Sequence, residues 1–273
     1  MNSEAIISVN HLEARYDESI VLNDVTFNVL SGEILGILGG SGCGKTTLLR
    51  HMVGLLRPFE GNVIIDGVDI TACDSKSFRR TLRKIGVLFQ SAALFGSMTL
   101  VENVILPIAE YGGLSPLATE TMARMKLDLV GLAGYENHLP SELSGGMKKR
   151  AGLARALALN PKILFLDEPS AGLDPIISAE IDELILHINQ TIGTTIIIVT
   201  HELESVFSVA KRVIVLDKSV KGIRAEGDPH RLRDFSPDPL VQQFFHRKSS
   251  QMDPPEDVDR PIPSTNGLSD RGR

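Results

Sequence analysis

The amino-acid sequence predicts an α/β fold in which helices cover both faces of a mainly parallel core sheet. Residues 34–38, 163–166 and 196–199 are almost wholly aliphatic or β-branched, which is typical of strands buried on both faces. Helical patterns separate these strands: 46–53 follows a glycine-rich turn, and 178–190 carries isoleucine and leucine at helical spacing. The alternation of buried strands with such helices favours a parallel sheet.

Two further regions depart from that alternation. Residues 6–29 alternate apolar and polar side chains, and 63–67 forms a short apolar run that ends in a turn. We therefore expect an antiparallel β subdomain at the start of the chain. From about 91 to 158 the strand pattern disappears, and helix formers dominate 117–130 and 148–159. This segment predicts a helical subdomain inserted into the α/β core.

The sequence predicts one domain over residues 1–245 and a C-terminal tail over 246–273. The tail is rich in proline, aspartate and serine and poor in apolar residues. Such a composition predicts a segment that is disordered or that folds only on a partner. No internal repeat is visible, so we expect one nucleotide-binding module in the chain and not a tandem pair.

The composition excludes several classes of protein. The 273 residues are 42% hydrophobic and carry a net charge of −6, which argues against a nucleic-acid coat and a polybasic membrane binder. The two cysteines, Cys43 and Cys73, form neither a disulfide framework nor a cysteine-rich metal site, and favour a reducing compartment. There is no run of about 18 apolar residues and no signal-peptide pattern, so we expect a cytosolic chain that does not span a membrane.

A glycine-rich loop, residues 39–46, matches G-x-x-x-x-G-K-[ST] between a predicted strand and a predicted helix. Its glycines let successive backbone N–H groups face one anion, to which the helix N-terminus adds a positive end. We expect Lys45 to reach the β- and γ-phosphates of a nucleotide and the Thr46 hydroxyl to bind Mg²⁺. The alternative is a strand–helix turn that binds no ligand. The predicted nucleotide contacts here are Gly39, Gly40, Ser41, Gly42, Cys43, Gly44, Lys45, Thr46 and Thr47.

A second predicted strand ends in two carboxylates, Asp167 and Glu168. Combined with the phosphate loop, this pair places Asp167 to hold Mg²⁺ and Glu168 to polarise an attacking water molecule. Carboxylates at a strand end are alternatively helix caps, and Pro169 after them is compatible with a simple turn. The presence of both motifs in one chain favours the catalytic interpretation.

A third motif, Leu143-Ser144-Gly145-Gly146-Met147, lies between the other two and precedes three basic residues. Ser-Gly-Gly at the start of a helix offers free N–H groups and a hydroxyl to an anion, although by itself it is more often an N-cap and turn. The order of the phosphate loop, Gln90, this motif, the carboxylate pair, residues 170–174 and His201 resembles the nucleotide-binding domain of an ABC transporter. The resemblance covers about residues 6–245 and implies a P-loop ATPase of that type.

The resemblance implies roles for four further residues. Tyr16 corresponds to the aromatic residue that stacks on adenine, the alternative being a half-buried strand tyrosine. Gln90 would contact Mg²⁺ and the attacking water, and His201 would face the γ-phosphate. Asp174 would link two active sites across a dimer. The implied catalytic set is therefore Lys45, Gln90, Glu168 and His201, and the implied Mg²⁺ ligands are Thr46, Gln90 and Asp167.

In this family the Ser144-Gly145-Gly146 segment does not reach the phosphates bound by its own chain. The resemblance therefore implies a head-to-tail dimer of two copies, each ATP lying between the phosphate loop of one copy and this segment of the other. It also implies an integral membrane permease as partner, ATP and Mg²⁺ as cofactors, and a peripheral location on the cytoplasmic side of the inner membrane. Met147 departs from the usual glutamine, and the contacts made at that position are therefore in question.

Met147, together with residues 89–95 and 171–176, further resembles the ATPases of Mce-type lipid systems, which include the Mla phospholipid transporters. This branch implies transport of phospholipid between inner and outer membranes. It also implies an Mce-domain substrate-binding protein and a small STAS-domain accessory protein, and no nucleic-acid partner.

Three other functions remain open from the sequence: an importer ATPase for another solute, a soluble ABC ATPase of metal-cluster assembly, and a binding module without turnover. The permease groove implied by the resemblance lies around 91–104. Its apolar members either contact the permease or belong to the core of the helical insert; they are Leu94, Phe95, Met98 and Leu100.

Overall fold

The computed structural model describes residues 4–246 and contains two β-sheets. The core sheet has six strands in the order β10-β9-β3-β8-β7-β6, and all of its pairings except β9–β10 are parallel. The predicted fold class is therefore confirmed. From residue 247 onward, the predicted tail lies outside the described residues. The core strands are β3 (Ile34–Gly39), β6 (Ile85–Leu88), β7 (Ile163–Asp167), β8 (Thr195–Val199), β9 (Arg212–Asp217) and β10 (Gly222–Gly227).

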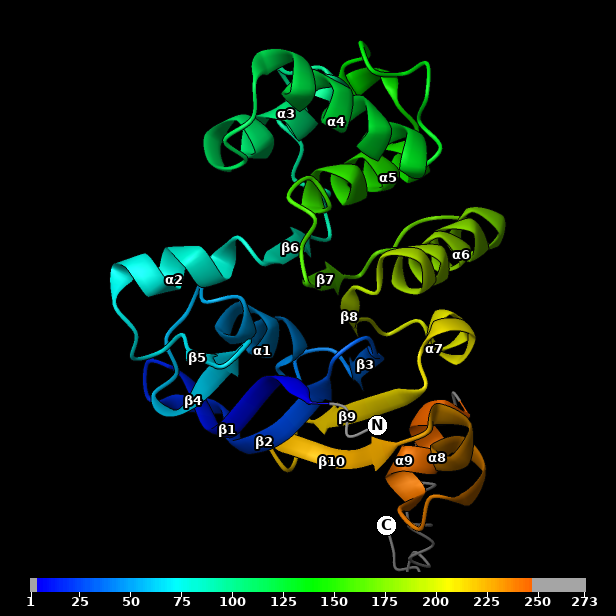
Figure 1. Cartoon of the computed structure of the whole chain (residues 1–273). Helices are drawn as coiled ribbons and strands as arrows, with labels where there is room; N and C mark the ends of the chain where they lie inside the picture. Colours follow the sequence, from blue (N-terminus) through cyan, green and yellow to red (C-terminus); the bar gives the residue numbers. More distant parts are fainter. Residues whose placement is uncertain (1–3, 247–273) are drawn as a thin grey trace, which may run out of the picture.

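The core sheet buries apolar side chains on both faces, because successive residues of a strand point to opposite sides. Leu35 and Ile37 of β3 belong to a cluster with α1 (Lys45–Met52) and the antiparallel sheet. Ile34 and Leu38 of the same strand belong to a second cluster with α6 (Pro175–Ile192) and α7 (Leu203–Val209). Figure 1 shows α1 on one side of the core sheet and α6 and α7 on the other.

The second sheet has four antiparallel strands in the order β2-β1-β4-β5. β1 (Ala5–Tyr16) pairs with β2 (Ser19–Leu30) and with β4 (Glu60–Ile65), and β5 (Val68–Asp69) pairs with β4. The predicted strands over 6–29 and 63–67 thus form an antiparallel unit, although β4 begins earlier and ends before the turn at Asp66.

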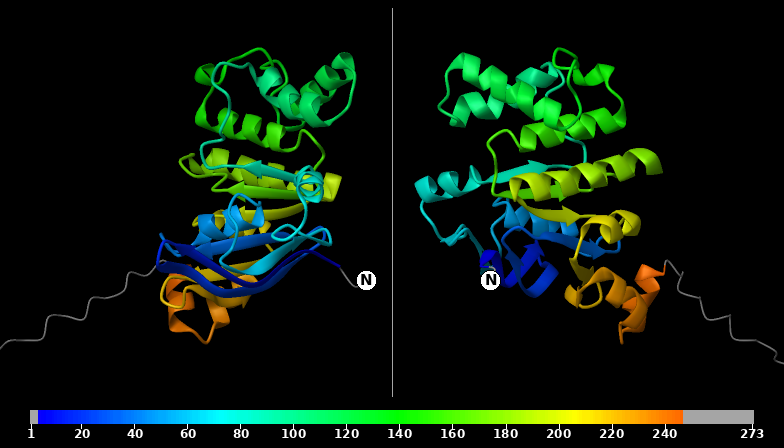
Figure 2. Two further views of the ribbon diagram at one scale, coloured as in Figure 1. Left: turned by 90° about the vertical axis from the view of Figure 1, so that its left-hand side faces the viewer. Right: turned by 45° about the vertical axis from the view of Figure 1, so that its right-hand side comes forward.

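The chain between β6 and β7 contains helices: α3 (Leu100–Tyr111), α4 (Pro116–Leu129), a 3₁₀ turn η1 (Pro140–Glu142) and α5 (Gly145–Ala156). They gather at one end of the molecule in both views of Figure 2. α4 and α5 lie within a few residues of the predicted helical segments. α3 was not predicted as a separate helix; it begins with a capping box of Thr99 and Glu102 and contains Pro107. The exact division into subdomains stays a prediction.

The remaining helices are α2 (Ser75–Leu82), α8 (Pro229–Phe235) and α9 (Pro239–Phe245). Within residues 4–246, none of the helices is both long and apolar enough to cross a membrane.

Candidate functional site

Four neighbouring parallel strands end at one edge of the core sheet. Ile37 of β3 pairs with Val199 of β8, and Val199 pairs with Asp167 of β7. β6 runs parallel beside β7. The carboxyl ends of parallel strands form the usual ligand-binding edge of an open α/β sheet. Each of these four ends carries one part of the predicted site, at its last residue or just after it: the phosphate loop, the carboxylate pair, Gln90 and His201. The fold therefore brings these parts to the same edge.

The predicted phosphate loop connects β3 to α1, which begins at Lys45. Gly39 has φ of 149°, and a Cβ there would lie 2.4 Å from the carbonyl oxygen of Leu216. Only glycine fits this backbone position. The Lys45 ammonium donates to the Gly39 carbonyl at 2.8 Å and to the Gly40 carbonyl at 3.1 Å. Lys45 therefore folds back over the loop, with its charge at the N-terminus of α1.

Other predicted nucleotide contacts lie close to the loop. Ser41, Gly42 and Thr46 are exposed, Thr47 is partly buried, and Cys43 is buried. Burial raises the pKa of the Cys43 thiol. Leu22 of β2 lies against Gly44 and pairs with Ala14 of β1. This hairpin ends at Tyr16, which is 45% exposed, so Tyr16 lies on an element that contacts the loop.

Asp167 is the last residue of β7 and is buried, and its Oδ1 atom is one of three buried side-chain atoms without a hydrogen-bond partner in the described part of the chain. Burial, together with the charge of Glu168, raises the pKa of the Asp167 carboxyl. An unsatisfied buried carboxylate oxygen requires an explanation. Mg²⁺ prefers carboxylate and hydroxyl oxygens, so Asp167 and Thr46 fit this ion, which when bound would neutralise phosphate charge.

The carboxylate of Glu168 is held by two residues that follow β8. Thr200 Oγ1 donates to Glu168 Oε2 at 2.9 Å, and Nδ1 of His201 lies 2.8 Å from Oε1. Glu168 itself has φ of 50°, which is left-handed and uncommon for a residue with a side chain. Such an outlier is often found at a functional site, where the surrounding structure maintains it. Both oxygens of this buried side chain therefore have a fixed direction.

The Ser-Gly-Gly segment and Asp174 lie on other elements. Ser144 is the N-cap of α5 and accepts a hydrogen bond from the Met147 N–H at 3.3 Å, and Met147 packs against the apolar core. Asp174 is the N-cap of α6 and accepts from the N–H groups of Ile176 and Ile177. In Figure 1, α5 lies among the helices at the top and α1 lies in the lower half. The structure does not bring this segment to the phosphate loop.

An apolar groove of about 580 Å³ runs between β6, α3 and the end of α5. Its exposed apolar side chains are Phe95, Leu106 and Tyr111. Arg155 lies 5.7 Å from the Phe95 ring centroid and donates to the carbonyls of Ala92 and Ala93. Of the four apolar residues predicted for this region, Leu100 is buried in the core, Leu94 packs against it and Phe95 lines the groove. Met98 is partly buried and belongs to neither the core cluster nor the groove lining.

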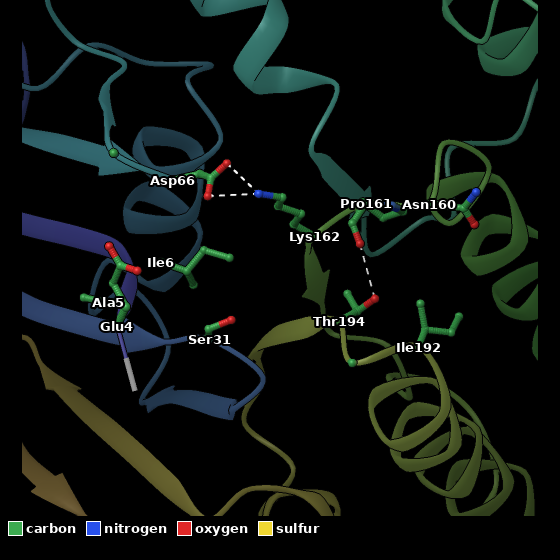
Figure 3. Close-up of a pocket in the computed structure, with 12 residues that line it drawn as sticks. Glu4, Ala5, Ile6, Ser31, Asp66, Asn160, Pro161, Lys162, Ile192 and Thr194 are labelled. Carbon is green, nitrogen blue, oxygen red and sulfur yellow. Dashed lines mark hydrogen bonds and ion pairs between the residues drawn. The ribbon is translucent and has the colours of Figure 1, made fainter. Parts of the chain in front are cut away.

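A separate cavity of about 450 Å³ lies at the opposite edge of the core sheet. Lys162 and Thr194, which line it, directly precede β7 and β8, and Lys162 is paired with Asp66 (Figure 3). The cavity therefore lies where the parallel strands begin and is distinct from the site at their ends.

Two residues that sequence reasoning missed contact the site. Thr200 was overlooked beside His201, and no motif marks it. Lys149 donates to the carbonyls of Gln90 and Glu168, but in the sequence it stands only as one of three basic residues after Met147. Helical spacing could have distinguished it, because Gly146, Lys149 and Leu153 occupy the buried face of α5.

Comparison with known proteins agrees with this arrangement. The family model described as ABC transporter matches residues 22–171. A probable ribonucleotide transport ATP-binding protein of Mycobacterium tuberculosis is 42% identical over 240 residues, which cover 88% of this chain and 66% of the relative. A methionine import ATP-binding protein of Rhizobium meliloti is 45% identical over 72% of this chain and 55% of its own length. The chain thus spans about two thirds or less of these relatives.

Solved structures of similar proteins match most of the described chain. A dimeric bacterial ABC transporter cassette aligns with a TM-score of 0.75 and 33% identity, covering 81% of this chain and 98% of that one. A post-hydrolysis state bound to ADP and Pi gives a TM-score of 0.73 at 32% identity, with the same coverage. The cbiO1 protein of Clostridium perfringens gives a TM-score of 0.77 at 29% identity, over 90% of this chain and 96% of that one. Because the family model covers more than half of the residues, the chain belongs to the ABC transporter family.

Proposed function

We propose that the chain is the ATPase subunit of a membrane transport complex and that its site works with the residue roles given above. Lys45 and the loop hold the phosphates, Asp167 and Thr46 hold Mg²⁺ together with Gln90, and Glu168 is the general base. The observation that carries this proposal is the anchored carboxylate of Glu168, at the edge where the phosphate loop also begins. A base must be oriented toward the attacking water, and fixed hydrogen bonds provide that orientation.

The active form in this proposal is a head-to-tail dimer of two copies. Ser144 and Gly145 are exposed at the start of α5, in a part of the molecule remote from the phosphate loop. A second copy turned by a twofold axis would bring its own Ser144 segment to the nucleotide of the first. The dimeric state of a related cassette supports this arrangement.

The proposed permease contact is the apolar groove lined by Phe95, Leu106 and Tyr111. These side chains are 49%, 40% and 48% exposed, and contiguous exposed apolar surface is typical of interaction sites. The groove also receives Phe89, the residue before Gln90. A cytoplasmic helix of an integral permease is the occupant that we propose, on the cytoplasmic side of the inner membrane, because movement in the groove would pass directly to Gln90.

The proposed cargo is phospholipid moved between inner and outer membranes, with an Mce-domain substrate-binding protein and a STAS-domain accessory protein as further partners. This part rests on the resemblance of Met147 and of residues 89–95 and 171–176 to Mce-type ATPases. A second candidate is import of a small solute. Relatives described as ribonucleotide transport and methionine import proteins, at 42% and 45% identity, favour it.

Purification of the tagged chain from native membranes in mild detergent separates these candidates. Mass spectrometry identifies the partners and lipid extraction identifies bound cargo. We expect a permease, an Mce-domain protein and phospholipid. Recovery of a permease with a solute-binding protein and no lipid would contradict the phospholipid cargo and support import of a small solute. Purely soluble partners would refute the transport proposal.

A further inference from the structure

Lys149, in the middle of α5, connects two separate parts of the site through main-chain carbonyls. Its ammonium donates to the carbonyl oxygen of Gln90 at 2.5 Å and to that of Glu168 at 2.8 Å. The residue is only 7% exposed. One side chain from the helical insert therefore holds both the loop after β6 and the residue after β7.

The position of this ammonium has an energetic cost and a compensation. Burial lowers the pKa of Lys149, whereas the charges of Asp167, Glu168 and Glu202 raise it. A buried charge is tolerated where it is paired and hydrogen-bonded. The two carbonyls and the nearby carboxylates supply that compensation. They also hold the Lys149 side chain in one orientation, and its removal would leave these groups without their buried partner.

The carbonyl of Glu168 matters because this residue has a left-handed backbone, with φ of 50°. Its N–H donates to the Val199 carbonyl at 2.8 Å, and its C=O accepts from Lys149. The peptide groups on both sides of the Glu168 side chain are thus fixed by hydrogen bonds. The same C=O accepts a longer hydrogen bond from the Ala171 N–H at 3.3 Å, so loss of the Lys149 bond would weaken the restraint on the strained conformation at this carbonyl.

We propose that Lys149 is a positioning residue for ATP hydrolysis, which fixes Glu168 for the reaction and joins it to the groove-lining loop at Gln90. The inference rests on the proposed role of Glu168 as base. It assigns to α5 a task beyond presenting Ser144 to the partner copy. If an occupant of the groove displaces the loop at Gln90, the Lys149 ammonium, which binds the carbonyls of both Gln90 and Glu168, transmits that displacement to the base.

The same chain contains a matched control in Lys126. Like Lys149, Lys126 is a buried lysine of the helical region, and burial lowers its pKa. Its ammonium, however, donates to Asn160, which lines the cavity at the opposite edge of the sheet from the site. Replacement of either lysine by methionine removes a buried ammonium of similar cost. Only Lys149 contacts residues of the site.

The experiment compares kcat for ATP and nucleotide affinity in Lys149→Met, Lys149→Arg and Lys126→Met. We expect Lys149→Met to lower kcat by about tenfold or more, because small misplacements of a reacting group are costly, with nucleotide affinity within about threefold of wild type. Lys149→Arg keeps several donors and should recover most of the rate. Lys126→Met should keep kcat whatever its melting temperature. A Lys149→Met enzyme with wild-type kcat, or an arginine variant as slow as the methionine variant, overturns the proposal.

Two additions keep the test decisive. If Lys149→Met does not melt cooperatively, Lys149→Gln replaces it. The shorter amide can hold one carbonyl, so kcat should fall about threefold at unchanged affinity, and wild-type kcat overturns the proposal. Glu168→Gln, measured in parallel, distinguishes the proposed role of Glu168 as base from the proposed role of Lys149 as positioning residue. Wild-type turnover in Glu168→Gln refutes Glu168 as base, whereas loss there with normal turnover in Lys149→Met refutes only the positioning role.

Discussion

His201 Nδ1 lies 2.8 Å from Glu168 Oε1, although 33 positions separate the two residues in the sequence. The contact follows from the sheet, because Glu168 and His201 follow the ends of the adjacent parallel strands β7 and β8. Thr200 binds the other carboxylate oxygen. The two residues after β8 thus fix the carboxylate that we propose as the base, before any contact with a second copy of the chain.

Glu168→Gln should abolish turnover while ATP binding persists, since the amide cannot accept a proton but has nearly the same shape. We expect kcat to fall by at least about a hundredfold and the ATP-bound dimer to accumulate in size-exclusion chromatography. Glu183→Gln, an exposed change on α6, is the control and should behave as wild type. Normal hydrolysis by the Glu168→Gln protein would remove Glu168 as the base.

The order of buried strands and helices could be predicted from the sequence because burial on both faces leaves continuous apolar runs. β3, β7 and β8 are buried throughout, and their predicted ranges differ from the observed ones by at most one residue at each end. Three core strands were not predicted. β6 and β10 are partly buried, so their periodicity is weaker, whereas β9 contains a continuous buried apolar run over 213–216 that the same pattern could have identified. Register, which aligns Ile37, Val199 and Asp167, depends on long-range pairing that no local pattern specifies.

Parts of the site that carry a motif of fixed spacing could be predicted, whereas Thr200 and Lys149, which no motif marks, were missed. The phosphate loop and the Asp167–Glu168 pair are short contiguous motifs in the sequence. Lys149 binds carbonyls 59 and 19 positions away, and a carbonyl has the same chemistry at every residue. Such a partner is visible only after the fold brings β6, β7 and α5 together.

Ser144→Arg should block closure of the dimer in trans, because a long charged side chain at the N-cap of α5 would fill the space that the partner's nucleotide must enter. We expect ATP hydrolysis by the homogeneous variant to fall by at least about tenfold, while the folded monomer still binds ATP. Thr121→Arg, which adds the same charge on an exposed position of α4, should leave hydrolysis unchanged. Full activity in the Ser144→Arg dimer would contradict the head-to-tail arrangement.

Asp66 should make the stability of the chain dependent on pH. Hydrogen bonds from Lys84, at 2.5 Å, and from Lys162, at 2.9 Å, hold its pKa below the ordinary value (Figure 3 shows the Lys162 contact). A lowered folded pKa contributes stability above the unfolded pKa of about 4 and loses it as the pH falls through the folded value. Asp66→Asn should therefore lower the free energy of unfolding at pH 7 by about 1 kcal/mol or less.

The measurement is urea denaturation of both proteins between pH 7 and pH 3, where the difference between them should shrink toward zero. Asparagine tolerates the left-handed backbone of Asp66, whose φ is 46°. Asp17→Asn is a matched control, because Asp17 is exposed at a turn with φ of 51°. A difference for Asp66→Asn that stays constant with pH would contradict the assigned pKa direction.

The two glycines of the Ser-Gly-Gly segment should respond differently to alanine. A Cβ at Gly146 would lie 2.6 Å from Cγ2 of Ile177 on α6, whereas a Cβ at Gly145 meets nothing closer than Leu173 Cδ2 at 3.4 Å. Gly146→Ala should therefore lower the free energy of unfolding by about 1–3 kcal/mol through overpacking. Gly145→Ala should change it by less than about 1 kcal/mol, because alanine is tolerated in the first turn of a helix.

Ile177→Ala removes the methyl group that opposes a side chain at Gly146, so the double variant Gly146→Ala/Ile177→Ala tests the cause. If the close approach of α5 to α6 explains the loss, the two changes together should destabilise the chain less than the sum of the single changes. Urea denaturation in the absence of nucleotide measures this coupling. Strict additivity, or a Gly146→Ala protein as stable as wild type, would contradict the packing explanation. Coupling without nucleotide would mean that helix packing alone requires Gly146, whatever its N–H contributes to an anion bound by the partner copy.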